Sequence, residues 1–129
     1  MFLNVIDLAV QALKTDCVTL SITAGTSQNL MIKIYDEEGS LVVPPAGSKM
    51  RMSVKKYLED SSTAFDVDFE RRTDYFLGLI TMPMTEDLTP GRYYYNVIYS
   101  PDAATFYEVI KTSIFYLSPS PVDGGALWN

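Results

Sequence analysis

Apolar and polar residues alternate with a period of two along most of the chain, a pattern typical of β-strands that have one buried face. The clearest case runs from residue 91 to residue 100, directly after the turn signal Pro90-Gly91. One face of this strand would carry an apolar row and the other a mixed row: Tyr93, Tyr95, Val97 and Tyr99 against Tyr94, Asn96, Ile98 and Ser100. We predict that the aromatic row is buried and that this is the central strand of an antiparallel sheet.

Other stretches repeat the same alternation, and turn-forming residues separate them. A short segment at 41–43 ends at Pro44-Pro45, and since proline cannot donate to a ladder, it belongs at an edge or corner. Seven or eight strands with turns every 8–12 residues or so predict an all-β, two-sheet antiparallel β-sandwich. The predicted strands are residues 17–23, 28–35, 49–57, 65–70, 75–82 and 105–117, of which 75–82 is apolar on both faces and is expected in the interior of a sheet.

The two ends differ from this pattern. Residues 1–16 form an N-terminal arm or short helix, because Leu3, Ile6, Val10 and Leu13 fit a helical stripe that Asn4 could cap. The same stretch could instead be a strand covering the core or an extended arm reaching a neighbouring subunit. Residues 120–129 are rich in proline and glycine and form a C-terminal arm. The predicted domain therefore spans residues 17–119.

Composition excludes several classes of function. The chain has 129 residues, enough for one domain, and a net charge of −6, which argues against nucleic acid and against an anionic membrane surface as partners. Neither a signal peptide nor a membrane-spanning run is recognisable. Cys17 is the single cysteine, so no internal disulfide is possible. The absence of histidine removes the commonest general base and metal ligand.

Acidic residues give most of the candidates for chemistry at a site. Asp66, Asp68 and Glu70 share one face of a strand and, with the acidic turn at 36–38, could bind Ca²⁺ through oxygen ligands. A solvated strand face explains them better, because the spacing matches no EF-hand loop. Asp66 and Asp68 could also be paired carboxylates of a glycosidase, and Cys17 a nucleophile. No histidine is present to activate a nucleophile, so we expect no enzyme, no catalytic residues, no cofactor and no metal.

An ordered set of short motifs points to a family. The late strand fits the pattern L-x-x-G-x-Y-x-Y-x-[VIL], and the residues around it keep the same order of turns and strands. The set resembles the immunoglobulin-like modules of tail, baseplate-upper and fibre-associated proteins of tailed bacteriophages. One departure is the hairpin at 101–104, which lacks the glycine of the family pattern. The motifs stand at Ala24-Gly25-Thr26, 30–35, 36–39, 50–55, 88–97, Ser100-Pro101-Asp102 and 114–119.

The resemblance implies an Ig-like sandwich that serves as a non-enzymatic virion structural or adaptor protein, assembled in the host cytoplasm. Its partners would be other virion proteins and copies of itself, in a tail, neck or baseplate position, with capsid decoration as the alternative. The residues expected at interfaces are Leu3, Ile6, Tyr94, Ile98, Leu127 and Trp128, with Phe115 as a further outward candidate. A second alternative is a carbohydrate-binding module that holds host glycan through Tyr94 and neighbouring aromatics.

Overall fold

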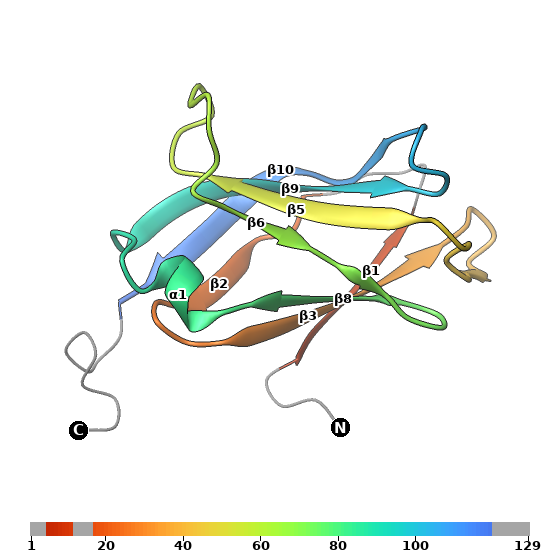
Figure 1. The fold of residues 1–129 in the computed structure, drawn as a ribbon, viewed down its shortest axis with the longest axis horizontal. Helices are drawn as coiled ribbons and strands as arrows, with labels where there is room; N and C mark the ends of the chain where they lie inside the picture. The colour runs from red at the N-terminus through yellow and green to blue at the C-terminus, as the bar shows by residue number, and fades with distance from the viewer. Residues whose placement is uncertain (1–4, 12–16, 120–129) are drawn as a thin grey trace.

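The fold is mostly β, with two sheets and one short helix, in a computed structural model that describes residues 5–11 and 17–119 (Figure 1). The predicted interface residues Leu3, Leu127 and Trp128 lie outside the described residues. The strands are β1 (Val5–Gln11), β2 (Leu20–Thr23), β3 (Gln28–Tyr35), β4 (Leu41–Val42), β5 (Lys49–Lys55), β6 (Phe65–Asp68), β7 (Glu70–Arg71), β8 (Phe76–Ile80), β9 (Gly91–Ser100) and β10 (Tyr107–Ser118), and the helix is α1 (Met82–Thr85).

The predicted central strand is confirmed. In the first sheet, which we call the β9 sheet, the strand order is β2-β10-β9-β5-β6, so β9 lies in the middle. It pairs antiparallel with both β10 and β5. All four residues of its aromatic row are buried, with exposed fractions of 1–4%. Alternation on a single strand thus predicted both its position in the sheet and its buried face.

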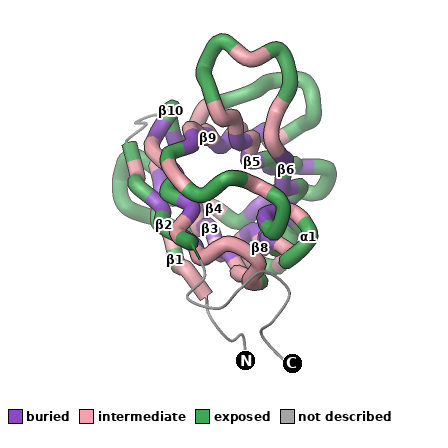
Figure 2. The backbone as a smooth tube through the Cα atoms, turned by 90° about the vertical axis from the view of Figure 1, so that its left-hand side faces the viewer, coloured by how far each residue is buried: buried purple, intermediate pink, exposed green. Residues whose placement is uncertain are grey.

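The second sheet, which we call the β3 sheet, has the order β1-β3-β8-β7, with β4 paired to the end of β3. Figure 1 shows the two sheets as two layers, and Figure 2 shows the buried positions inside and exposed residues in the loops. Buried apolar residues from both sheets form one hydrophobic core. The fold is therefore held by burial between two amphipathic sheets rather than by either sheet alone.

Two strand pairs differ from the antiparallel expectation. The segment Val5–Gln11 was expected in an arm or short helix, but it forms β1, which pairs in parallel with β3. β2 likewise pairs in parallel with β10. Of the alternatives left open for this stretch, the strand covering the core is the one found for Val5–Gln11, and the helix is not. Ile6, Leu8 and Val10 pack on the core from an extended edge strand, because tertiary pairing overrides a weak helical signal.

The chain crosses between the sheets at Phe69. β6 belongs to the β9 sheet and β7 to the β3 sheet, and Phe69 alone separates them. Its backbone N–H still donates to the carbonyl of Met50 at 3.0 Å. Its ring is buried against Gly78 of β8, where an added Cβ would lie 2.7–2.9 Å from three ring carbons. The buried ring of Phe69 at the crossing therefore requires glycine at position 78.

The crossing also corrects the candidate acidic site. Asp66 and Asp68 remain on β6, whereas Glu70 lies on β7 in the other sheet. Each acid has a partner on the protein: Thr63 for Asp66, Arg51 for Asp68 and Arg72 for Glu70. Within residues 5–11 and 17–119 no group of three or more acidic or thiol side chains is arranged to hold a metal. The expected shared acidic face is therefore wrong.

No helix among the described residues is long and apolar enough to cross a membrane.

Candidate functional site

The outer face of the β9 sheet, turned away from the core, carries both hollows described below. We call it the outer face. It is built from alternate positions of β5 and β9, which the pairing register places side by side: Arg51 opposite Ile98, Ser53 opposite Asn96, and Lys55 opposite Tyr94. The predicted interface residues Tyr94 and Ile98 both lie here, partly buried. Polar and apolar side chains therefore alternate across a flat platform.

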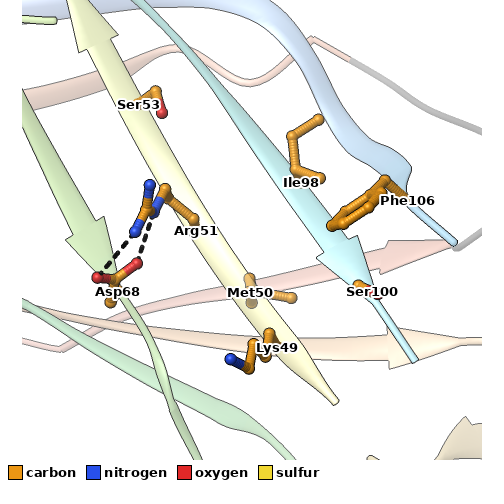
Figure 3. Close-up of a pocket in the computed structure, with 8 residues that line it drawn as sticks. All are labelled: Lys49, Met50, Arg51, Ser53, Asp68, Ile98, Ser100 and Phe106. Atoms are coloured by element: carbon orange, nitrogen blue, oxygen red, sulfur yellow. Dashed lines mark hydrogen bonds and ion pairs between the residues drawn. The ribbon is translucent and has the colours of Figure 1, made fainter. Parts of the chain in front are cut away.

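A groove opens at one end of the outer face, with a volume of about 320 Å³ (Figure 3). Ile98 and Phe106 supply its large apolar surfaces, and Phe106 is 65% exposed. Arg51 extends from β5 toward Asp68, away from Ile98 and Phe106, and binds it through two contacts, at 2.6 and 3.2 Å. We call this site the groove, and its lining residues are Lys49, Met50, Arg51, Ser53, Asp68, Ile98, Ser100 and Phe106.

The residues that line the groove include two cations and one carboxylate, and the carboxylate of Asp66 also acts on Arg51 from nearby. The hydrogen bond from Arg51 lowers the pKa of the Asp68 carboxyl, and Lys49 adds to this effect. The same bond raises the pKa of Arg51. Two cations thus surround one carboxylate, in a chain whose net charge is −6. Both partners of the ion pair are well exposed, so its effect is on local charge and geometry more than on stability.

A shallower hollow of about 190 Å³ lies next to the groove and shares Ser53 with it. Tyr94 and Leu58 give it apolar surface, and Lys55 and Asn96 give it polar groups. The side-chain amide of Asn96 donates to the Glu108 carboxylate at 3.1 Å, which fixes its orientation. This hollow combines an aromatic ring with polar groups.

The loop that carries Phe106 is held by one carboxylate. Asp102 Oδ1 accepts hydrogen bonds from the backbone N–H groups of Ala104 at 2.8 Å and Thr105 at 2.7 Å. Ala103 between them has φ of 64°, in the left-handed region that glycine usually occupies. The hairpin therefore uses a left-handed residue without glycine, and Asp102 stabilises this conformation.

These hydrogen bonds lead to a pH prediction. Those from Thr105 and Ala104 lower the pKa of the Asp102 carboxyl, so the loop contacts are complete above the ordinary value of about 3.9 and are lost as pH falls through the lower folded value. We expect the amide resonances of Ala104 and Thr105 to titrate with a midpoint below about pH 3.9, followed by NMR. Asp102→Asn should abolish this titration. A midpoint at or above the ordinary value would contradict the prediction.

The remaining sequence candidates lie elsewhere. Phe115, expected as a possible outward aromatic, is fully buried and packs edge-on against Phe65 and Tyr95. Ile6 packs against the core from β1. Cys17 is exposed, and its thiol donates to the Thr112 carbonyl at 3.8 Å.

Sequence reasoning missed Phe106, Lys49 and Arg51 as parts of one site. Alternation predicted that Arg51 points away from the core, but only the pairing register places it opposite Ile98. The available signal was Phe106 itself, a large apolar residue directly after a polar hairpin loop. Such a position is exposed unless something covers it.

Comparison with known proteins gives structural neighbours but no family. No protein-family model and no curated protein sequence matches the chain. One similar structure is "N-terminal domain of phage TP901-1 ORF48", with 10% identity and a TM-score of 0.46, covering 89% of this chain and 99% of that one. Another is "Structure of PbICP-C in complex with falcipain-2", with 13% identity and a TM-score of 0.45, covering 87% and 98%. At these scores neither likeness assigns a family or a function.

Proposed function

We propose that this chain is a non-enzymatic structural or adaptor component of a tailed-phage virion, in the tail, neck or baseplate, and that it binds neighbouring proteins through the outer face. The observation that carries the proposal is the groove, where an exposed aromatic, an aliphatic and two cations meet on a rigid sheet. Exposed aromatic and arginine side chains over an apolar floor are features of protein-binding surfaces. Placement in a virion rests on the sequence motifs described above.

An Ig-like arrangement of the fold supports the same proposal. Within the β9 sheet, the order β10-β9-β5-β6 matches the G-F-C-C′ order of such domains, with β9 and β10 as the final hairpin. The hydroxyl of Tyr93, near the start of β9, donates to the Thr89 carbonyl at 2.8 Å, four residues upstream. A tyrosine bonded back in this way at this corner is a recurring feature of Ig-like domains. It also gives a role to Tyr93, the first of the tyrosines that follow Gly91 in the motif.

The chain is proposed to act without catalysis. Asp66 and Asp68, the two candidate catalytic carboxylates, each bind another side chain of the same chain, Thr63 and Arg51 respectively. A rigid surface that presents contacts needs no such group, and its affinity would come from buried anchors such as Ile98 and Phe106.

Co-sedimentation with virions tests the proposal. Ile98→Asp places a charge in the groove, and a matched variant, Leu79→Asp, places one at a 45% exposed site on β8 in the other sheet. We expect the wild-type chain and Leu79→Asp to co-purify with tail-bearing particles and Ile98→Asp to be depleted about tenfold or more, the loss expected for roughly 1.4 kcal/mol of binding energy. Thermal unfolding checks that both variants fold. A wild-type chain that stays entirely in the soluble fraction would refute a virion role.

A glycan-binding module is the second candidate, favoured by the shallower hollow alone. Its Tyr94 ring is flanked by Asn96 and Lys55, an arrangement that suits a sugar face with polar edges. Titration of a glycan array distinguishes the two, with Tyr94→Ala as the matched variant. Glycan binding that disappears in Tyr94→Ala would favour this candidate.

A further inference from the structure

The groove combines features that fit a particular kind of protein segment. Phe106 and Ile98 offer apolar contact, while Lys49 and Arg51 surround the single carboxylate of Asp68. Because two cations and one carboxylate line the groove, its lining favours a segment that carries carboxylates beside apolar side chains, although Asp66 and Glu108 lie close by. A purely apolar partner would add no opposite charge beside Lys49 and Arg51, which share the one carboxylate of Asp68, and a basic partner would be repelled.

The groove is also ordered before any partner binds. The carboxylate of Asp102 holds the backbone N–H groups of Ala104 and Thr105, and so fixes the loop that ends at Phe106. An aromatic side chain on a fixed loop loses less conformational entropy on binding than one on a free loop. Phe106 therefore has the properties of a preformed anchor.

One buried polar group at the groove has no partner within the described part of the chain. Ser100, which lines the groove, is 2% exposed, and its hydroxyl makes no hydrogen bond there. A buried hydroxyl without a partner is unfavourable. Its oxygen has almost no accessible surface, so an incoming carbonyl or carboxylate could accept its proton only after the side chain rotates toward the groove.

The turn between β3 and β4 has the complementary chemistry. Glu37 and Glu38 are exposed, and neither forms an ion pair with any residue that the structure describes. Leu41 and Val43 follow them and are 38% and 62% exposed. Asp36 Oδ1 accepts hydrogen bonds from the N–H groups of Glu38 and Ser40, at 2.9 Å each, so this turn is rigid as well. We call residues 36–43 the acidic turn.

We propose that the acidic turn of a second copy docks in the groove. Glu37 and Glu38 would face Lys49 and Arg51, while the exposed aliphatic side chains of the turn would cover Phe106. This inference rests on the proposed protein-binding function and names its partner as another copy of the same chain.

The placement of the two elements suits contact between copies. The acidic turn and the groove lie at the same end of the molecule (Figure 1). Two copies meeting end to end can each place the acidic turn in the other's groove, which closes a two-fold dimer. If each copy uses only one of the two elements, the same contact propagates as an open array.

Sedimentation velocity on the full chain tests the contact directly, at low and at high salt. We expect association that increases with protein concentration and weakens as salt is added. The charged side chains at the contact are exposed, so salt screens their attraction. Glu37→Lys/Glu38→Lys and, separately, Phe106→Ser should each weaken it by about tenfold or more. The matched control is Glu86→Lys/Asp87→Lys, which makes the same charge change just after α1, at the other end of the molecule, and should associate like the wild type.

A charge exchange makes the test specific. Lys49→Glu combined with Glu37→Lys/Glu38→Lys in one chain should restore association that the turn variant alone has lost. Wild-type protein that remains monomeric at all concentrations, or a turn variant that associates unchanged, would overturn the inference. A chain that enters virions but never self-associates in solution would refute this contact and leave the proposed function standing. A chain that self-associates but is absent from virions would refute the proposed function and leave this contact standing.

Discussion

Replacing Phe115 by alanine should lower the free energy of unfolding by about 3–5 kcal/mol, the usual range for a fully buried phenylalanine. Phe115 has no exposed surface, and its ring centroid lies 5.9 Å from that of Phe65 and 6.2 Å from that of Tyr95, both edge-on. It therefore joins β10 to β6 and β9 through one aromatic cluster. A small domain is stable by only about 5–15 kcal/mol, so this loss is a large share of the total.

Urea unfolding followed by fluorescence or circular dichroism measures this loss. The neighbouring Tyr116 is a suitable control, because it is 40% exposed and its hydroxyl only accepts a hydrogen bond from Arg92, at 3.3 Å. Tyr116→Ala should cost less than about 1 kcal/mol, in line with most surface substitutions. If Phe115→Ala proved as mild as Tyr116→Ala, the aromatic cluster would not be the centre of the core.

Replacing Gly78 by alanine should destabilise the chain by about 1–3 kcal/mol, the usual cost of adding a methyl group to a filled space. The new Cβ would lie 2.7 Å from Phe69 Cε2, closer than atoms in contact normally approach. The ring cannot easily move away, because Phe69 is the residue at which the chain passes from one sheet to the other. The cost therefore arises from the crossing and not from the backbone conformation of Gly78.

A double-mutant cycle separates these causes. Phe69→Leu alone should cost some stability through lost packing, but adding Gly78→Ala to it should cost clearly less than in the wild type. Interaction energies between residues in contact are commonly about 0.5–3 kcal/mol. Equal costs in both backgrounds would show that the glycine is required for another reason.

Period-two alternation predicted the two sheets and the central strand. Beyond an irregularity in a strand, however, it no longer predicts which face a residue occupies. β10 has register shifts between Glu108 and Ile110 and again between Ile110 and Ser113. Each such bulge changes which face the following residues occupy. Counting alternate positions through both shifts therefore could not place Phe115, whereas regular β9 gave a buried row that the structure confirms.

Half of the groove could be predicted, because the outward positions of β5 and β9 follow from alternation. The other half depends on pairs that are distant in the sequence. Arg51 meets Asp68 across β5 and β6, and Phe106 returns over the end of β9 after the hairpin. Register and loop conformation are set by the packed fold, which local sequence preferences only bias.

The parallel pairing of β2 with β10 has a consequence under mechanical load. Leu20 lies beside Phe115 and Thr23 beside Ser118, so the first residue of β2 and the last of β10 are at opposite ends of the pair. Tension applied to the chain before β2 and after β10 would slide the two strands along each other. All hydrogen bonds of the pair then resist together, whereas an antiparallel pair pulled from one end would open one bond at a time.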